Sequence, residues 1–470
     1  MRKHSRQKET STKVSFSPSA ALPFPVEMVP LTKLRPADRN ARTHSKKQIQ
    51  QIAASMKRFD VVNPLIADER GKIIAGHGRF EAAKLLGLKF VPVIQLTDLS
   101  DAESRAYMLL DNKLAQNAGR DREVLALELA ELQIALPEFG LDLGITGFDP
   151  GEIDSIIEDF AEDRADPSDE IPELEASVTA RTDDVFILGP HRLVVGDAKD
   201  EQSFIHLMQS DMAEMAFLDP PYNVPINGYA AGHGRTKYRE FANASGEMSP
   251  DQFIGFLKKT LGLCARFTIN GGITYCCMDW KHAGELLQAG ATVYDELKNI
   301  CVWAKTTPGL GSFYRSQHEL VFVYKRGKAP HLNTIQLGQH GRSRSNVWSY
   351  GGSGTFRAGR LDELKMHPTV KPVALIVDAM RDCSRRGSII LDAFAGSGST
   401  IMAAEQIGRR AYCIEIDPQY VDVAIRRWHK VTGKDAILES TGQTFEELQA
   451  TRAETSKTRQ QSNRRQKGTR

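Results

Sequence analysis

The stretch Ser388-Ile-Ile-Leu-Asp392-Ala-Phe394-Ala-Gly396-Ser-Gly398-Ser-Thr400 decides the fold of the second half of the chain. Its apolar run predicts a buried strand, and the Gly-x-Gly turn that follows predicts the start of a helix. Glycines let a ligand approach the backbone closely, and the first turn of a helix offers N–H groups without partners inside the helix. A turn that only packs the strand against the helix is the simpler alternative.

The residues after this turn indicate which ligand it would hold. A dinucleotide fingerprint requires a third glycine, but Ile401 stands at that position. Glu415 closes the next apolar run, about twenty residues beyond the turn, where a carboxylate can accept hydrogen bonds from both hydroxyls of a ribose. The pattern therefore favours a nucleoside-bearing ligand without a pyrophosphate over NAD.

A second informative segment, Asp219-Pro220-Pro221-Tyr222, follows the apolar run Met215–Leu218. Two prolines stiffen the loop and remove N–H donors, which leaves consecutive carbonyl groups free to accept hydrogen bonds. The Asp219 carboxylate and the Pro220 carbonyl can each accept an N–H from an exocyclic amine, while Tyr222 stacks on the base. These residues, Pro221 included, are the predicted catalytic residues; an ordinary turn is the alternative.

Together the two segments resemble the signatures of the S-adenosylmethionine-dependent DNA amino-methyltransferases. The catalytic motif precedes the cofactor motif, and this order resembles the circularly permuted beta group. The resemblance covers roughly Asp184 to Val431 and implies a permuted, Rossmann-like α/β sheet with S-adenosyl-L-methionine as cofactor. The implied cofactor-binding residues are Asp197, Lys371, Asp392, Phe394, Gly396, Gly398 and Glu415.

Shorter matches support the same resemblance. His367-Pro368-Thr369-Val370-Lys371-Pro372 resembles the motif ahead of the cofactor strand, which is implied to cover the methionine end of the cofactor. Gly196-Asp197 resembles the pair that reaches the cofactor's adenine. Asp279-Trp280 and Arg315-Ser-Gln-His318-Glu319 also stand where the group has such residues.

The irregular stretch from Arg326 to Met366 falls where the group places target recognition. Arginines beside Trp348 and Tyr350 suit phosphate contacts and base-edge readout, and a solvated surface loop is the alternative. Because the target base must leave the stack, Asn223–His233 is expected to form a loop that closes over it. The predicted DNA contacts are Arg315, Arg342, Arg344 and Arg357.

The first half predicts a small α+β unit that resembles the ParB/sulfiredoxin-like N-terminal domain. Leu34-Arg35-Pro36, Asn40-Ala-Arg42 and Gly76–Ala83 carry the resemblance. Gly76, Gly78 and Arg79 open a helix, where N–H groups and a guanidinium suit a phosphate. Two roles stay open, namely binding of a nucleotide or DNA phosphate and a purely structural role that positions DNA. A sulfiredoxin activity is excluded because no cysteine precedes Cys264.

Composition fits a multidomain globular protein, with 470 residues, 41% of them hydrophobic and 26% charged. The sequence has no run of membrane-spanning length, no signal sequence and no metal-ligand spacing of cysteines, so we expect a cytoplasmic protein with neither membrane nor metal. The expected organisation is a disordered basic tail (1–25), a ParB-like domain with a helical extension (26–164), an acidic linker (165–183), the methyltransferase domain (184–440, with target recognition at 326–366) and a basic, disordered tail (441–470).

These observations predict a site-specific adenine-N6 DNA methyltransferase of the restriction–modification type. Cytosine-N4 methylation is the alternative in the same reaction class, although that group more often carries Ser in place of Asp219. Cytosine-C5 chemistry is excluded because no cysteine lies between Gly196 and Leu263. From another class, a ParB-like DNA-binding protein with a degenerate methyltransferase half is the alternative. The expected partners are double-stranded DNA and a nucleotide at the N-terminal domain. A homodimer is compatible with the sequence.

Overall fold

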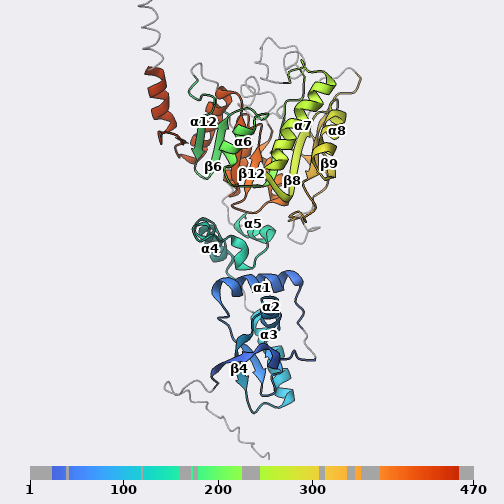
Figure 1. Cartoon of the computed structure of the whole chain (residues 1–470), viewed down its shortest axis with the longest axis vertical. Coiled ribbons are helices and arrows are strands. Elements are labelled where there is room, and N and C mark those ends of the chain that lie inside the picture. Colours follow the sequence, from blue (N-terminus) through green and yellow to red (C-terminus); the bar gives the residue numbers. More distant parts are fainter. Residues whose placement is uncertain are drawn as a thin grey trace, which may run out of the picture. The chain divides into compact units, whose positions relative to one another are not determined.

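A computed structural model describes residues 24–38, 42–117, 120–158, 171–172, 178–224, 244–305, 308, 313–335, 344–350 and 371–454. The chain divides into two compact units (Figure 1). The first lies within Met1–Arg122 and Gly144–Gly147, and the second within Glu123–Leu143 and Phe148–Arg470. No helix in the described ranges is both long and apolar enough to span a bilayer.

The helices are α1 (Lys46–Phe59), α2 (His77–Leu85), α3 (Asp101–Asn117), α4 (Arg122–Ala135), α5 (Pro150–Glu158), α6 (Glu201–Met208), α7 (Pro250–Arg266), α8 (Ala283–Val293), α10 (Val373–Cys383), α11 (Ser399–Gln406) and α12 (Pro418–Thr432). The strands are β1 (Val26–Pro30), β2 (Leu65–Asp68), β3 (Ile73–Ala75), β4 (Phe90–Leu96), β5 (Val185–Leu188), β6 (His191–Val195), β7 (Ala213–Leu218), β8 (Thr268–Met278), β9 (Glu296–Ala304), β10 (His318–Lys325), β11 (Val347–Ser349), β12 (Ile389–Asp392), β13 (Arg410–Glu415) and β14 (Ile437–Leu438).

The first unit is built on a small mixed sheet with the strand order β1-β4-β2-β3. Ser45 caps the start of α1, since its hydroxyl accepts a hydrogen bond from the Gln48 N–H at 3.1 Å. Ala53 and Met56 of α1 are buried in the same core cluster as Phe80 of α2 and Val93 of β4. These contacts hold α1 over the start of α2, where the predicted phosphate-binding residues lie.

The second unit contains a large sheet with the order β11-β9-β10-β8-β7-β12-β13-β6-β5-β14. As predicted, its centre is parallel, from β8 through β7, β12 and β13 to β6. The sheet is not parallel throughout, because β10 runs antiparallel to β8 and β9, and β5 to β6. Only Gly189 and Pro190 separate β5 from β6, and so short a connection can join only antiparallel strands.

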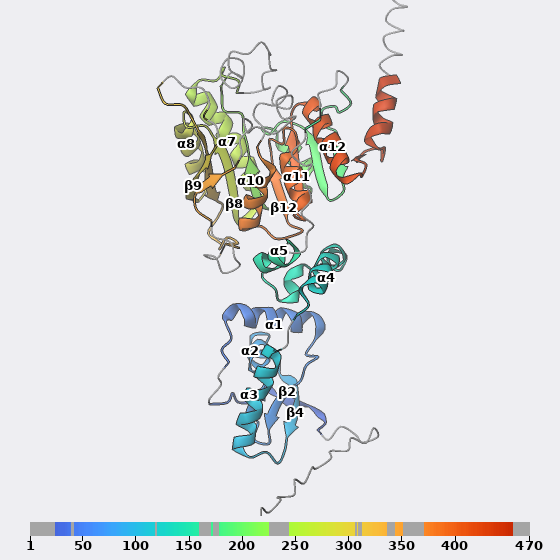
Figure 2. The same ribbon diagram turned by 180° about the vertical axis from the view of Figure 1, so that it is seen from behind.

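Helices cover both faces of this sheet (Figures 1 and 2). Alternate residues of β7 show the division. Met215 and Phe217 pack in one core cluster with α10, α11 and α12. Ala216 and Leu218 pack in the other cluster with α6, α7 and α8. The strands are therefore buried on both faces, which leaves the ends of the strands as the place for a site.

Three of the expected boundaries differ from the structure. The expected division near Ala165 would leave α4 and α5 with the first unit, but both helices lie in the second. The buried pair between Asp154 of α5 and Arg409 explains the difference, because both carboxylate oxygens lie 2.8 Å from guanidinium nitrogens. The acidic linker also ends early, since the Thr179 and Ala180 N–H groups donate to Asp422 of α12.

The C-terminal tail begins later than expected. Residues 445–454 are helical, and Phe445 and Leu448 are buried in the core of the second unit. Arg452 donates hydrogen bonds to Asp184 at 2.5 and 2.9 Å, so this segment is tied to the start of β5. The sequence expectation followed the density of basic residues and missed the two apolar side chains. The basic segments 1–23 and 455–470 lie outside the described residues.

Candidate active site

The two predicted motifs lie next to each other at one edge of the large sheet. The motif strands β12 and β7 are parallel neighbours, with Leu391 opposite Ala216. From β12 the chain continues through α11 to β13 on one side, and from β7 it continues through α7 to β8 on the other. Ligands of open α/β sheets bind where the strand order reverses in this way, outside the carboxyl ends of the strands. The glycine turn and the Asp219 loop both lie at this point.

The glycine turn is held in shape by Asp392. One Asp392 oxygen accepts the Phe394 N–H at 2.9 Å, and the other accepts the Thr400 hydroxyl at 2.6 Å. Asp392 was predicted to contact the cofactor, but its side chain is buried and both oxygens serve the turn. Burial raises the pKa of Asp392 to about 7. Asp392 therefore positions the backbone that would face the ligand.

Glycine is needed at the two positions of this turn for different physical reasons. Gly396 has a φ of +51°, and a Cβ placed on it would meet no atom of the described residues within 4 Å. Gly398 has a φ of +82°, and its Cβ would lie 2.9 Å from the Cβ of Ala424. Gly398 is thus required by the packing of α11 against α12, whereas Gly396 leaves open space beside the backbone. An open space next to a helix N-terminus is what a nucleoside-bearing cofactor needs.

Glu415 lies beside this open space, at the carboxyl end of β13. Its carboxylate accepts the Gly396 N–H at 2.8 Å and the Asp417 N–H at 2.9 Å. Burial raises the pKa of Glu415 to about 7. Each carboxylate oxygen can still accept a further hydrogen bond, so Glu415 fits the predicted ribose contact.

Asp197 lies on the neighbouring strand end. The Gly196 N–H donates to the Glu415 carbonyl at 2.9 Å, which places Asp197 directly after the residue paired with β13. Its carboxylate accepts the Lys199 N–H at 2.9 Å. Four of the predicted cofactor residues therefore lie at or after the carboxyl ends of adjacent parallel strands, namely Asp197, Phe394, Gly396 and Glu415.

The Asp219 loop carries a compact network of charges. The Lys371 ammonium donates to both Asp219 oxygens at 2.7 Å and lies 3.0 Å from an oxygen of Glu319. The Tyr222 hydroxyl lies 2.7 Å from Asp219 and 3.1 Å from Glu319. Lys305 contacts the other Glu319 oxygen at 2.5 Å. Two carboxylates, two ammonium groups and a phenol therefore meet at one point.

Lys371 was predicted to contact the cofactor, and that role stays a prediction. The structure places its ammonium against the Asp219 loop, since Lys371 lies two residues before α10 and is buried under Tyr222 and Trp303. Glu319 and Lys305 were not predicted as site residues. Glu319 ends the segment Arg315–Glu319, which resembles the methyltransferase group, so the sequence contained a signal for it. No motif in the sequence indicated Lys305.

The network fixes the ionisation of its members. Burial lowers the pKa of Lys371, but Asp219 and Glu319 raise it by more, so the ammonium form is stabilised. Burial raises the pKa of Glu319, but Lys371 and Lys305 lower it to about 2. Burial also raises the pKa of Asp219, and Lys371 opposes that shift. The cluster thus holds its charges in pairs, which limits the cost of burying them.

Among the predicted DNA contacts, Arg344 stays a prediction, although its side chain has partners within the unit. Its guanidinium lies 2.9 Å from Asp378 and 3.3 Å from Asp382, both on α10, and 4.9 Å from the Trp348 ring. Trp348 itself is buried in β11, the strand beside β9. These side chains fix an edge strand to the body of the unit and do not face outward.

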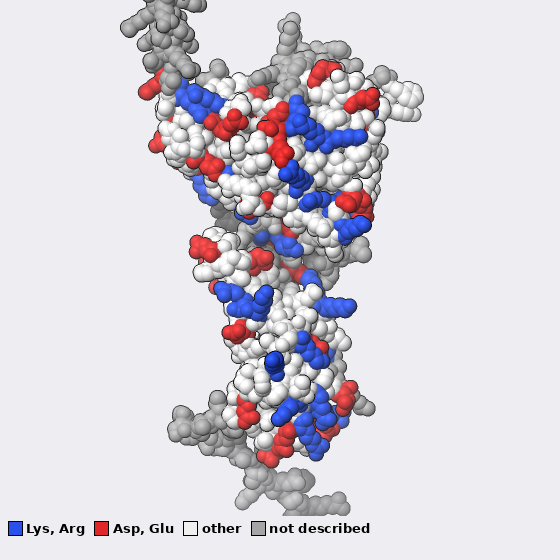
Figure 3. Space-filling model, in the orientation of Figure 1, with Lys and Arg blue, Asp and Glu red and all other residues white. Residues whose placement is uncertain are grey.

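The remaining predicted contacts stay predictions. Arg315 is exposed, at the edge of the sheet where β9 ends and β10 begins, and its guanidinium donates to the Pro308 carbonyl at 3.0 Å. Arg342, Arg357 and most of the Asn223–His233 loop lie outside the described residues, as do His367 to Val370. Figure 3 shows acidic and basic side chains interspersed on one face, so charge alone does not mark a DNA surface there.

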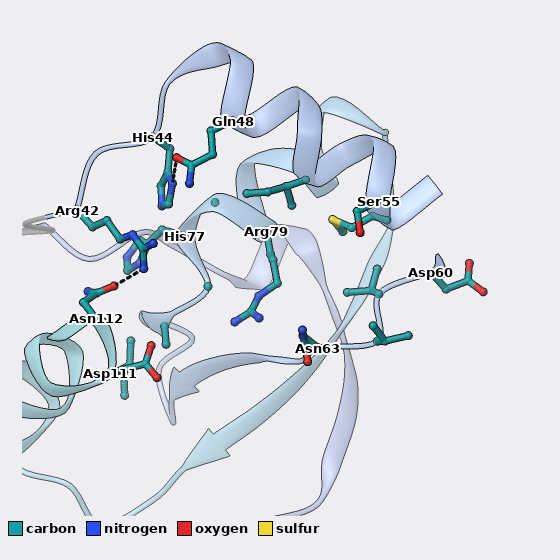
Figure 4. A pocket seen from close by; sticks show the side chains of 18 residues that line it. Arg42, His44, Gln48, Ser55, Asp60, Asn63, His77, Arg79, Asp111 and Asn112 are labelled. Carbon is teal, nitrogen blue, oxygen red and sulfur yellow. Dashed lines mark hydrogen bonds between the residues drawn. The ribbon is translucent and has the colours of Figure 1, made fainter. Parts of the chain in front are cut away.

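The first unit has its own cavity, of about 400 Å³, at the start of α2 (Figure 4). Arg79 points into it, and its Nε is buried without a hydrogen-bond partner in the described part of the chain. Arg42 donates to Asn112 at 3.0 Å on the cavity wall. A Cβ on Gly78 would lie 2.9 Å from the Ile52 Cδ1 and 3.0 Å from the His44 ring, so α1 packs closely on α2 at this glycine. Gly76, with a φ of +96°, begins the helix.

The described residues contain no cluster of three or more His, Cys, Asp or Glu side chains arranged to hold a metal ion. The six cysteines are all buried and unpaired with one another. Burial raises the pKa of the Cys264, Cys276 and Cys413 thiols, which keeps them protonated. None of them is suited to act as a nucleophile.

This combination of a glycine turn and an Asp-Pro-Pro-Tyr loop at the switch point defines an S-adenosyl-L-methionine-dependent methyltransferase. Family comparisons agree in detail. The DNA methylase family matches residues 213–426, the ParB N-terminal domain matches 21–113, and the ParB-methyltransferase HTH domain matches 123–182. The chain therefore carries a DNA methylase domain together with a ParB-type N-terminal domain. The HTH unit was not predicted from the sequence, which treated its residues as a helical extension and a linker.

Relatives match the two halves separately. The ParB-like nuclease domain-containing protein YnaK of Escherichia coli (strain K12) is 49% identical over 76 residues, which cover 16% of this chain and 87% of the relative. The type II methyltransferase M2.DpnII of Streptococcus pneumoniae is 25% identical over 236 residues, 48% of this chain and 87% of the relative. The structure of the M1.HpyAVI–SAM complex aligns with 50% of this chain and 97% of its own, with 16% identity and a TM-score of 0.37.

Proposed function

We propose that the second unit transfers the methyl group of S-adenosyl-L-methionine to N6 of adenine at specific sites in double-stranded DNA. The observation that carries this proposal is the placement of Asp219 beside the glycine turn. A carboxylate that accepts N–H groups lies next to the open space at Gly396. An exocyclic amine bound to Asp219 would therefore face the cofactor.

The cofactor supplies a methyl group on a positively charged sulfur, so the protein needs no strong base to activate the amine. Asp219 and the Pro220 carbonyl accept the two N–H groups and orient the nitrogen lone pair. Tyr222 lies against the base. After the transfer the nitrogen gives up a proton, and Asp219 is the carboxylate placed to receive it.

Before substrate binds, Lys371 and Glu319 stabilise the Asp219 loop. A buried carboxylate without a partner is costly, and the Lys371 ammonium supplies that partner. When the amine of the base arrives, it takes up acceptor positions on Asp219. Glu319, 3.0 Å from the same ammonium, keeps Lys371 paired during this exchange. We therefore assign Glu319 and Lys371 a positioning role.

Adenine is preferred over cytosine because the loop carries Asp219, where cytosine-N4 enzymes more often carry Ser. The assay incubates the full chain with duplex DNA and labelled cofactor, followed by nucleoside digestion and mass spectrometry. N6-methyladenine is expected. If only N4-methylcytosine is found, the choice of adenine is wrong but the mechanism still holds. If methyl groups are transferred only to RNA or protein, the proposal of a DNA methyltransferase is wrong. Absence of cofactor binding in calorimetry would favour a ParB-like DNA-binding protein with a degenerate second half.

For the first unit we propose that the cavity at α2 binds a phosphate group of a nucleotide. The unpaired Nε of Arg79 supports this proposal, because a buried guanidinium nitrogen without a partner is costly and an anion would satisfy it. Calorimetry with nucleoside triphosphates is expected to detect binding that Arg79→Ala removes. Equal affinity of the variant, or no binding by the parent chain, would leave the structural role.

A further inference from the structure

Phe313 and Tyr314 are unusually exposed aromatic residues in the connection between β9 and β10. Solvent reaches 87% and 82% of their surfaces. Their rings pack on each other, with centroids 4.5 Å apart in an edge-to-face arrangement. Adjacent large rings that lie against each other and bury almost no area elsewhere contribute little to folding, which points to a role in binding.

The connection lies at the same edge of the sheet as the Asp219 loop. Strand β9 runs antiparallel to β10, β10 antiparallel to β8, and β8 parallel to β7, so β9 ends where β7 ends. Glu319, near the start of β10, contacts the Tyr222 hydroxyl at 3.1 Å. Five residues of extended chain, from Tyr314 to Glu319, span at most about 18 Å. The exposed rings therefore lie within reach of the base pairs around a base bound at Asp219.

A third aromatic residue shares this edge. Trp280 lies two residues after the end of β8 and is 56% exposed. In the described part of the second unit, the large aromatic side chains this exposed are Phe139, Trp280, Phe313 and Tyr314, and all but Phe139 lie at this edge. Exposed Lys281 and Arg315 stand next to them in the chain. Exposed rings interleaved with cations fit nucleic acid better than a protein surface, because they combine stacking with phosphate contacts.

We propose that Phe313 and Tyr314 form an aromatic wedge that stacks on the bases beside the target and holds the target base out of the duplex. This inference rests on the proposed function, since an exocyclic amine is reached only after the base leaves the stack. Extrusion leaves the neighbouring base faces without a partner. Rings inserted or stacked there replace part of the lost stacking and slow the return of the base.

The test compares two duplexes that carry the sequence found to be methylated. One is fully paired, and the other has an abasic site opposite the target base, where extrusion is already easier. For the Phe313→Ala/Tyr314→Ala variant we expect kcat/KM on the paired duplex to fall about 10- to 100-fold, with a much smaller loss on the abasic duplex. Cofactor affinity measured by calorimetry is expected to stay unchanged. The control is Leu297→Ala, which removes an exposed apolar side chain at the opposite end of β9. Its kcat/KM should be unchanged on both duplexes.

Equal losses on both duplexes, or no loss on either, would overturn the wedge. If the double variant converts a dimer to a monomer in sedimentation, the rings belong to an interface between copies and the wedge is also overturned. If the parent chain methylates neither duplex, the proposed function fails first. The three results are distinct.

Discussion

The Lys371 ammonium lies 2.7 Å from both carboxylate oxygens of Asp219, although the two residues are 152 positions apart. Tyr222 donates to one of the same oxygens at 2.7 Å. Asp219 is therefore surrounded by donors before any substrate arrives. An amine that enters must exchange with Lys371, so the chemistry of the loop depends on residues outside its own motif.

Asp219→Ala is expected to abolish methyl transfer and to leave cofactor affinity within a few-fold. The cofactor would contact Gly396 and Glu415, on other strand ends, while Lys371 keeps Glu319 as a counter-ion. Methyl transfer is measured with labelled cofactor, and affinity by calorimetry. A large loss of cofactor affinity in a folded variant would contradict this division of roles.

Glu319→Gln tests the positioning role. Without this charge, Lys371 has only Asp219 as an anionic partner and competes more strongly with the amine. We expect kcat to fall about ten-fold, in line with the loss of one hydrogen bond to a charged group, while cofactor affinity is unchanged. Glu296→Gln is the matched control, because Glu296 is an exposed carboxylate that also pairs with two lysines on these strands. If the two variants have equal kinetics, Glu319 has no positioning role in the site.

Glu415→Ala is expected to weaken cofactor binding by about 1.5–3 kcal/mol, the range for hydrogen bonds to a charged group. The change also removes the acceptor of the Gly396 N–H, so the glycine turn loosens at the same time. Calorimetry gives the affinity, and circular dichroism checks the fold. If affinity stays the same, the ribose contact lies elsewhere, and Asp417 is the next residue to test.

The local parts of this site could be predicted from the sequence, because single segments encode them. A strand, a Gly-x-Gly turn and a helix follow one another in the chain, and so do β7 and Asp219-Pro220-Pro221-Tyr222. The contacts of Lys371 could not be predicted in this way. Its distance from Asp219 depends on how β10, α10 and β7 pack, and no local pattern records that packing.

Arg344 has partners that its local sequence does not indicate. Composition places it among Gly, Ser and Asn, which suggests an exposed loop, but two acids of α10 hold its guanidinium. Asp154 is a similar case, since it was expected in a helical extension of the first domain and its pairing with Arg409 was not foreseen. In both cases the ion partner lies far along the chain, so the charge alone did not tell surface from interior.

Two buried carboxyl groups make the stability of the second unit depend on pH. The pKa values of Asp392 and Glu415 are about 7 in the folded chain, above the ordinary values of 3.8 and 4.5. A raised pKa means that the folded state binds protons more readily, so this contribution is complete below pH 4 and is lost as the pH rises through 7. The free energy of unfolding is therefore expected to decrease from pH 5 to pH 8.

Asp392→Asn should flatten this dependence, because the amide cannot ionise yet retains an acceptor for the Phe394 N–H. Denaturant unfolding followed by tryptophan fluorescence suits the measurement, since all four tryptophans lie between residues 280 and 428. Identical pH profiles for the variant and the parent chain would show that Asp392 does not titrate in this range.

The last prediction concerns the buried ion pair between Asp154 and Arg409. Asp154 is 3% exposed and Arg409 1%. Burial raises the pKa of Asp154, but Arg409, Arg386 and Arg381 lower it further, so the carboxylate stays charged inside the protein. A bidentate pair of this kind orders the two elements that carry it, and loss of one partner leaves a buried charge that typically costs about 3–5 kcal/mol.

A fragment that begins at residue 120 is therefore expected to fold and to bind cofactor, whereas one that begins at residue 178 lacks Asp154 and should be less stable by that amount. Asp154→Ala in the longer fragment should reproduce the loss, and Glu131→Ala, an exposed carboxylate on α4, should not. Denaturant unfolding gives the comparison, and calorimetry shows whether each fragment binds cofactor. If the shorter fragment is as stable as the longer one, then α4 and α5 are dispensable to the methyltransferase, and the boundary lies in the acidic stretch after all. If it is less stable but Asp154→Ala is neutral, the stabilisation comes from apolar contacts of these helices and the ion pair only fixes their orientation.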